Sequence, residues 1–196
     1  GGETAEITVD VATRRPPEGL VGFGLGGVEV GVDRRDFGWA FDRARAAGLR
    51  SVPHAGEADG PASVRAALDV LGADRIGHGV RSIEDPDLLR RLVDEQVPLE
   101  VCPSSNVCTG VAASIEEHPL PDLLAAGAFV TINTDDPPMF STTLVDEYLR
   151  IASAFDLDLA ALTDLVRNGV KASFLDDGHK RLLLAEIDTV AAGYRT

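Results

Sequence analysis

Short apolar runs that end at a polar residue recur along this chain, and their regular spacing is the feature that most constrains its fold. The runs begin near residues 20, 50, 75, 98 and 128, and each except the last is followed by a helical pattern. A spacing of about 25–30 residues is typical of repeated βα units. The sequence therefore predicts an α/β fold, either a parallel barrel or a doubly wound sheet.

Apolar periodicity and capping residues place the helices. Asp33 is expected to cap a helix that ends at Gly48 and whose inner face is formed by four residues, Phe37, Ala40, Phe41 and Ala44. Asp85 followed by Pro86 predicts another helix start. Further helices are expected at about 3–13, 61–72, 142–155, 159–173 and 178–193. One more helix is expected to start between Ser114 and Pro121 and to end at Gly127, and residues 103–106 are expected to form a polar loop.

The length of the chain limits how much of such a fold it can contain. Its 196 residues fit one domain, which we expect to span 1–196. A complete (βα)₈ barrel needs eight strands and about 250 residues. The chain is too short for that barrel by about three βα units.

Composition excludes several classes of partner. A formal net charge of −14 argues against binding to a nucleic-acid backbone or to an anionic membrane surface. No apolar run approaches the roughly 20 residues that span a bilayer, and the opening residues do not predict a signal peptide. Cys102 and Cys108 fit reduced thiols better than a disulfide framework. We therefore expect a cytoplasmic protein that acts on a small molecule.

Ionisable residues follow three of the predicted strands. They lie in His54-Ala55-Gly56-Glu57, in Gly77-His78-Gly79 and in Asp135-Asp136-Pro137. Ligands of α/β folds bind at the carboxyl ends of the strands, where the following loops converge. Histidine and carboxylate side chains suit a divalent metal such as zinc, and a nearby glutamate can act as a general acid. The pattern predicts a metal site with an acid beside it.

Each of these residues also has a plainer interpretation. Asp135-Asp136-Pro137 is about equally consistent with a turn or a helix cap. Cys102 is expected to be buried packing, and Glu29 to be a solvated residue of the glycine-dense turn at 24–29. His118 and His179 are expected to be structural or exposed. What favours a functional site is the presence of all three stretches at successive predicted strand ends.

Four stretches taken together give a resemblance to a known family. They are His54-Ala55-Gly56-Glu57, Arg75-Ile76-Gly77-His78-Gly79, residues 99–106 and Asn133-Thr134-Asp135-Asp136-Pro137. In this order and spacing the chain resembles the adenosine deaminase-like purine deaminases, which are metal-dependent (βα)₈ barrels. The resemblance extends over about residues 3–187. It implies a TIM barrel of which this chain holds about strands 4–8 with their helices.

The resemblance implies catalytic and metal-binding roles for four residues. His54 matches a zinc ligand, and Asp135 matches the aspartate that binds zinc and the activated water. Glu57 matches the acid that protonates the purine ring nitrogen next to the amino-bearing carbon. His78 matches the histidine that orients the hydroxide and stabilises the tetrahedral intermediate. Zinc is therefore the expected cofactor.

Three more residues are assigned by the same resemblance. Asp136 resembles the partner of the imidazole-ring nitrogen of the purine, and Gly27 the backbone donor to the remaining pyrimidine-ring nitrogen. Ser105 is expected to support the zinc site without binding the metal itself. Relatives often have Asp where Gly24 stands here, so that end of the pocket is expected to differ.

The implied reaction is the zinc-dependent hydrolytic deamination of adenosine or deoxyadenosine to the inosine-type product and ammonia. Aminofutalosine and adenine are alternative substrates for the same mechanism. The family takes two further zinc ligands from a His-x-His motif, and this sequence has none. The chain is thus either the C-terminal part of a longer enzyme or a truncated, inactive relative, and the other intact site residues favour the first.

A barrel without its first three strands would expose unpaired sheet edges. We therefore expect a completing N-terminal segment or a homo-oligomer.

Overall fold

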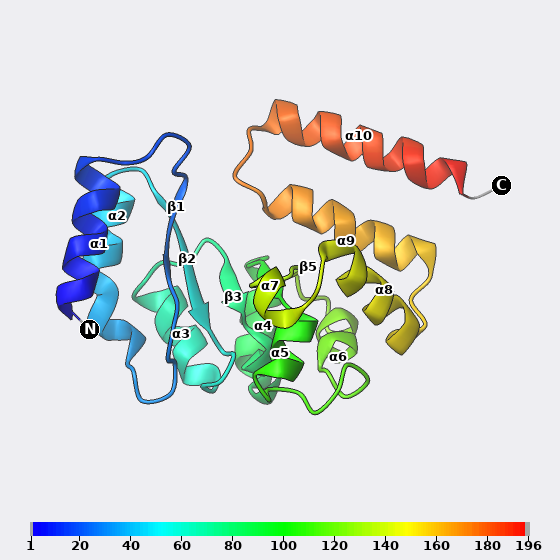
Figure 1. Cartoon of the computed structure of the whole chain (residues 1–196), viewed down its shortest axis with the longest axis horizontal. Coiled ribbons are helices and arrows are strands. Elements are labelled where there is room, and N and C mark those ends of the chain that lie inside the picture. Colours follow the sequence, from blue (N-terminus) through cyan, green and yellow to red (C-terminus); the bar gives the residue numbers. More distant parts are fainter. Residues whose placement is uncertain (1, 195–196) are drawn as a thin grey trace. The chain divides into compact units, whose positions relative to one another are not determined.

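The computed structural model describes residues 2–194, and the chain is divided into two compact units. The first unit is Gly1–Leu99 and the second is Glu100–Thr196. Figure 1 shows short strands alternating with helices along the chain, as the spacing of apolar runs predicted. The expectation of one domain over 1–196 stays a prediction.

The first unit contains three consecutive parallel strands. Its elements are α1 (Gly2–Arg14), β1 (Gly22–Leu25), η1 (Arg34–Phe37), α2 (Gly38–Ala46), β2 (Arg50–Ala55), α3 (Pro61–Asp69), β3 (Ile76–His78), η2 (Val80–Glu84) and α4 (Pro86–Asp94). β1 pairs with β2 in parallel, and β2 pairs with β3 in parallel. In the second pair His54 lies opposite Gly77 and Ala55 opposite His78. This register brings the predicted site residues of two strands to the same end of the sheet.

Local sequence explains where these helices begin. Asp33 accepts a hydrogen bond from the Arg35 backbone, so it caps a helical segment as predicted, but the first turn is a 3₁₀ helix. Asp85 accepts from the backbones of Asp87 and Leu88, and Pro86 occupies the first turn of α4. Each cap satisfies backbone N–H groups that a helix start leaves without a partner.

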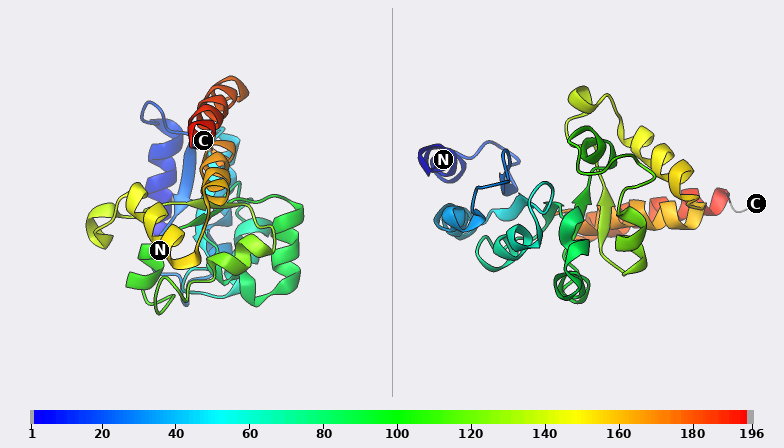
Figure 2. Two further views of the ribbon diagram at one scale, coloured as in Figure 1. Left: turned by 90° about the vertical axis from the view of Figure 1, so that its right-hand side faces the viewer. Right: turned by 90° about the horizontal axis from the view of Figure 1, so that it is seen from below.

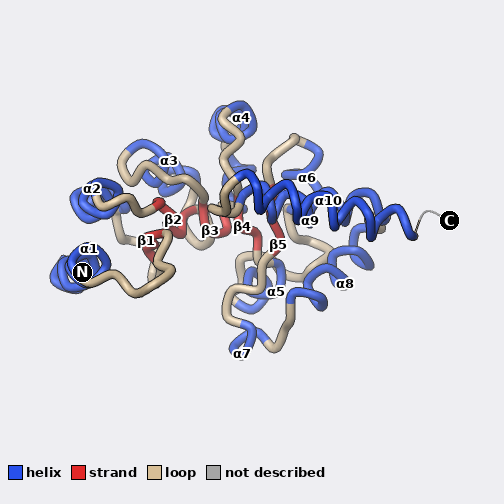
Figure 3. Tube along the Cα trace, turned by 90° about the horizontal axis from the view of Figure 1, so that it is seen from above, coloured by secondary structure: helices blue, strands red, loops and turns tan. Residues whose placement is uncertain are grey.

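The helices of the first unit cover its strands through apolar faces. Ala40, Phe41 and Ala44 of α2 are buried, and the ring of Phe41 meets that of Phe23 edge-on, with ring centroids 5.1 Å apart. α1 lies beside α2, as Figures 1 and 3 show. Phe37 is only half-buried, so the predicted inner face is confirmed for its other three members.

The strand β4 (Leu99–Val101) crosses the boundary between the units. The second unit continues with α5 (Pro103–Cys108), α6 (Leu120–Ala125), β5 (Val130–Ile132), α7 (Pro137–Phe140), α8 (Leu144–Phe155), α9 (Leu159–Ala172) and α10 (Asp177–Gly193). The Asn133 backbone N–H, just after β5, donates to the Val101 carbonyl of β4 at 2.9 Å. α9 and α10 run antiparallel and side by side (Figures 1 and 2).

The expected polar loop at 103–106 was wrong, because this segment forms the start of α5. Pro103 stands in its first turn, where the missing N–H costs nothing, and Ser104, Ser105 and Asn106 are buried. The polar composition suggested a loop, but the hydrogen bonds of these side chains are made inside the protein. None of the helices between residues 2 and 194 has both the length and the apolar composition needed to cross a membrane.

Candidate active site

His54 is the residue before the last of β2, and its imidazole lies against glycine backbone. A Cβ added at Gly77 would come within 3.1 Å of His54 Cγ, so any other residue there would require the ring or its surroundings to shift. The His54 Nδ1 atom is buried and has no hydrogen-bond partner among the residues that the structure describes. A buried polar nitrogen without a partner is costly, which fits a ring that binds a ligand.

His78 ends β3 in an unusual backbone conformation. Its φ is 61°, in the left-handed region that costs a non-glycine residue about 1–3 kcal/mol, and its side chain is 1% exposed. The rings of His54 and His78 are tilted by 53° with centroids 5.1 Å apart. Such strain is concentrated at functional sites, because surrounding structure must hold it in place.

Glu57 completes this cluster. It lies two residues beyond β2, is half-buried, and places Oε2 at 3.4 Å from His78 Nε2. The first unit therefore brings together His54, Glu57 and His78. Gly27, which is exposed and has a φ of 96°, lies in the same unit on the turn after β1.

The structure adds a residue to this cluster that the sequence interpretation missed. Glu29 was expected to be solvated, but it is 4% exposed, and its carboxylate accepts hydrogen bonds from the backbone of residues 56–59. Burial raises the pKa of Glu29, yet hydrogen bonds from Asp59, Ser63 and other loop groups outweigh it and hold the pKa below its ordinary value. Glu29 is therefore a buried anion.

In the second unit Ser105 and Asp135 are in contact. Ser105, fully buried in α5, donates from Oγ to Oδ2 of Asp135 at 2.7 Å. Asp135 has a φ of 55°, so it shares the strained left-handed conformation of His78. Asp136 occupies the N-cap position of α7 without a side-chain cap hydrogen bond, and it is exposed. Helix capping therefore does not account for an aspartate at position 136.

A second buried carboxylate, also missed, holds α5 in place. Glu147 of α8 is fully buried and accepts from the Ser104 backbone N–H at 3.0 Å and from Thr142 Oγ1 at 2.5 Å. Arg150 lies 3.5 Å from the same carboxylate. Nothing in the local sequence marks Glu147, because its partners are up to 43 residues away.

His118 is structural, as one sequence interpretation held. Its Nδ1 accepts from the Leu120 backbone N–H, and its Nε2 lies 3.0 Å from Asn106 Oδ1, which assigns the proton to Nε2. Burial lowers the pKa of His118 to about 4, so the ring is neutral. His179 is exposed in the first turn of α10, and Cys102 is buried as expected.

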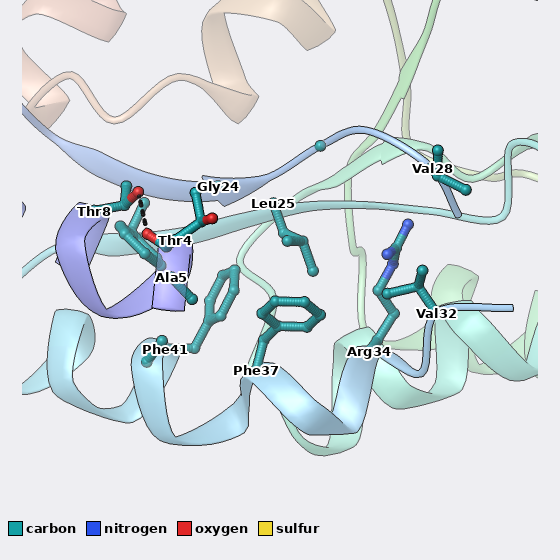
Figure 4. A pocket seen from close by; sticks show the side chains of 13 residues that line it. Thr4, Ala5, Thr8, Gly24, Leu25, Val28, Val32, Arg34, Phe37 and Phe41 are labelled. Atoms are coloured by element: carbon teal, nitrogen blue, oxygen red, sulfur yellow. Dashed lines mark hydrogen bonds between the residues drawn. The ribbon is translucent and has the colours of Figure 1, made fainter. Parts of the chain in front are cut away.

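A cavity of about 430 Å³ in the first unit is lined by residues of α1, β1, η1 and α2 and of the turn between β1 and η1. In Figure 4 the side chains of Phe37, from η1, and Phe41, from α2, point toward β1, and Leu25 lies above Phe37. Its lining includes Gly24 of β1 and Gly26 of the turn that follows, but none of the predicted site residues. The cavity is largely apolar and carries no acid or histidine.

Comparisons with known proteins agree on one family. A family model described as adenosine deaminase matches residues 2–190. The chain is 54% identical to an aminodeoxyfutalosine deaminase of Streptomyces avermitilis, over 99% of this chain and 55% of that protein. It therefore spans about half the length of the curated relatives it matches.

Solved structures give the same result. An adenine deaminase from Arthrobacter aurescens matches 97% of this chain and 58% of its own, with a TM-score of 0.93 and 37% identity. An amidohydrolase from Burkholderia ambifaria, solved with bound zinc, matches 97% of this chain and 55% of its own, with a TM-score of 0.89 and 27% identity. These matches confirm the α/β fold class and the expectation that the chain corresponds to part of a barrel.

Proposed function

Because this chain belongs to the adenosine deaminase family, we propose that it forms part of a hydrolytic deaminase acting on aminodeoxyfutalosine. The observation that carries the proposal is the cluster of His54, Glu57 and His78 in a chain 54% identical to an aminodeoxyfutalosine deaminase. The expectation of adenosine as the main substrate finds no support among the relatives reported above. Adenine is the second candidate, since a similar structure is that of an adenine deaminase.

His54 and Asp135 are the proposed metal ligands. The donor set of imidazole and carboxylate suits zinc, and the partnerless Nδ1 of His54 is consistent with a ring that serves as a ligand. Zinc, when bound in such a site, supplies a nucleophile at neutral pH by acidifying a coordinated water. Ser105 would orient the Asp135 carboxylate through its hydrogen bond.

Glu57 and His78 are the proposed groups that move and hold protons. Glu57 would donate a proton to the ring nitrogen beside the amino-bearing carbon, which removes the ring's resistance to attack by water. His78, 3.4 Å from Glu57, would orient the attacking oxygen and stabilise the negative charge that develops on it. Water adds, the bond from carbon to the amino nitrogen breaks, and ammonia and a carbonyl product result.

Two polar groups would position the base. Asp136 would be the hydrogen-bond partner of the imidazole-ring nitrogen of the purine, and the Gly27 backbone N–H would donate to the remaining pyrimidine-ring nitrogen. Both residues are exposed in their own units, which leaves them available to a ligand. The proposed partner is a small soluble purine compound, and a cytoplasmic location stays a prediction.

The zinc site needs ligands beyond this chain's own. The four histidines of the sequence contain no His-x-His pair, which the family uses for two further ligands. We propose that sequence upstream of residue 1, or another chain, supplies them. The alternative is that the protein is not an enzyme but an inactive relative, which keeps the pocket without the metal.

A substrate comparison tests the proposal. The protein is expressed with whatever upstream sequence its gene encodes, and ammonia release is followed with aminodeoxyfutalosine, adenine and adenosine. We expect kcat/KM for aminodeoxyfutalosine to exceed that for the other two by about tenfold or more. A preference for adenine would establish the second candidate, and no turnover of any of the three by zinc-loaded protein would contradict a deaminase.

A further inference from the structure

The buried carboxylate of Glu29 accepts hydrogen bonds from consecutive backbone N–H groups of the loop that carries Glu57. Oε1 accepts from the Gly56 N–H at 2.5 Å, and Oε2 accepts from the N–H groups of Glu57 at 3.0 Å, Ala58 at 2.7 Å and Asp59 at 2.9 Å. Consecutive N–H groups that converge in this way form an anion-binding nest. Here the anion is a side chain of the protein, 27–30 residues earlier in the chain.

The loop conformation depends on this arrangement. Gly56 has a φ of 69°, and a Cβ there would lie 2.4 Å from Val64 Cγ2, so glycine is needed to turn the N–H groups toward one point. Ser63 at the start of α3 adds a fifth donor to Glu29, from Oγ to Oε1 at 2.8 Å. Arg81 holds the other side of the loop by donating to the carbonyls of Gly56 and Ala58.

Arg34 links the same carboxylate to His54. Its side chain is 1% exposed, and Nη2 lies 3.9 Å from Glu29 Oε1. Its Nε donates to the backbone carbonyl of His54 at 3.0 Å. Figure 4 shows the Arg34 side chain extending from the helical segment toward the stretch that carries Val28. One ion pair therefore contacts the backbone of His54 and of Glu57.

We propose that Glu29 is a positioning residue for Glu57 and that Arg34 extends this positioning to His54. Glu29 does not contact the substrate in this account. It fixes the backbone from which the Glu57 side chain projects, so that the carboxyl stays 3.4 Å from His78. The inference rests on the proposed role of Glu57 as the acid of the deamination. A misplacement of about 1 Å of such a group can cost about 10²-fold in rate.

Hydrogen exchange tests the contact without any need for activity. In Glu29→Gln the new amide group can accept through only one of its two polar atoms, so part of the nest loses its acceptor. In the 196-residue chain we expect amides among residues 56–59 to exchange about tenfold faster than in the wild type. The matched control Glu18→Gln changes an exposed glutamate before β1 and should leave these amides unchanged. Unchanged exchange in Glu29→Gln would overturn the inference.

A milder variant covers the case in which Glu29→Gln does not fold. Ser63→Ala removes one donor to Glu29, one acceptor of the Gly56 N–H and a contact with the Gly60 carbonyl, and it leaves the contacts of Glu29 Oε2 with residues 57–59 in place. We expect faster exchange at Gly56, with smaller changes at Ala58 and Asp59. Faster exchange at Ala58 and Asp59 than at Gly56 would count against the nest, because their contacts with Glu29 Oε2 do not involve Ser63.

Kinetics separate positioning from a merely structural role. In the protein expressed with its upstream sequence, Glu29→Gln should lower kcat by about 10²-fold while KM stays within about threefold. In a Glu57→Gln background the same change should lower kcat by less than about threefold, because its effect passes through Glu57. Equal losses in both backgrounds would overturn the proposal.

The two proposals fail in distinguishable ways. A folded, zinc-loaded wild type that deaminates none of the three substrates would contradict the proposed function, while the exchange experiment would still decide whether Glu29 holds the loop. An active wild type whose kcat is unchanged by Glu29→Gln would overturn the positioning role alone.

Discussion

His78 presents its Nε2 atom 3.4 Å from Oε2 of Glu57, although His78 ends β3 and Glu57 follows β2. The parallel register that sets Ala55 opposite His78 creates this proximity, and the left-handed backbone of His78 aims its ring. An acid and an imidazole held together beside a second histidine can move a proton and stabilise a developing charge. This pair is the centre of the proposed chemistry.

Replacing Glu57 by Gln should abolish proton donation while keeping the side chain's size. We expect kcat to fall by about 10²–10⁴-fold, because an amide cannot serve as a general acid. The free energy of unfolding, measured by urea titration, should change by less than about 1 kcal/mol. The exposed Glu18→Gln variant is the control for both measurements. A kcat within tenfold of the wild type would remove Glu57 from the mechanism.

Gly77→Ala should disturb His54 directly. The new Cβ would lie 3.1 Å from His54 Cγ and 3.2 Å from its Cα, so the ring or the backbone must shift. We expect a loss of about 1–3 kcal/mol in unfolding free energy and weaker zinc binding, measured by competition with a chelating dye.

Gly169→Ala is the matched control for this change. It adds a Cβ with nothing within 4 Å in the last turn of α9, and it should stabilise the chain by about 0.4–1 kcal/mol. Equal stability and equal zinc affinity for Gly77→Ala and the wild type would show that the glycine is not needed to place the His54 ring.

Ser105→Ala removes the hydrogen bond to Asp135. Because the serine is fully buried and its acceptor is a carboxylate, we expect a loss of about 1–3 kcal/mol in unfolding free energy. Zinc affinity should fall by about 10–100-fold, since Asp135 would lose the group that orients it. The exposed Ser153→Ala variant in α8 should change neither quantity by a comparable amount. Unchanged zinc affinity would separate Ser105 from the metal site.

His118 should make the stability of the chain depend on pH. Burial lowers its pKa to about 4, whereas the unfolded chain binds the proton near pH 6.5. The free energy of unfolding is therefore highest above pH 6.5 as far as His118 is concerned. It falls as pH drops toward 4, because the unfolded state takes up the proton first. The total loss is about 3 kcal/mol.

Urea titrations between pH 4 and 8 measure this dependence. His118→Gln should remove this part of the fall in stability, and the exposed His179→Gln should retain it. Parallel curves for wild type and His118→Gln would show that His118 does not titrate as its burial predicts.

Much of the fold followed from sequence because its determinants are local. Apolar runs at a regular spacing gave the βα order, and Asp85-Pro86 gave a helix start that the side-chain cap confirms. The ionisable residues of the site were found for a related reason, since they lie at or just beyond the carboxyl ends of strands. His54 and His78 come together because neighbouring parallel strands end at the same edge.

What sequence did not reveal depends on distant contacts. Glu29 looks like any loop glutamate, and it is buried only because a loop 27–30 residues later turns its N–H groups toward it. Glu147 is likewise buried through a contact that is distant in the sequence, since its partner Ser104 lies in another helix. The start of α5 was mistaken for a loop because its polar side chains suggested solvent, although they are buried.

Ammonia release from aminodeoxyfutalosine, measured before and after zinc is chelated and again after zinc is restored, tests the central claim most directly. The protein is expressed with whatever upstream sequence its gene encodes, and zinc content is determined in each state. We predict turnover with about one zinc per chain, loss of turnover on chelation and recovery when zinc returns. Folded, zinc-loaded protein that releases no ammonia from this substrate or from adenine would contradict the account.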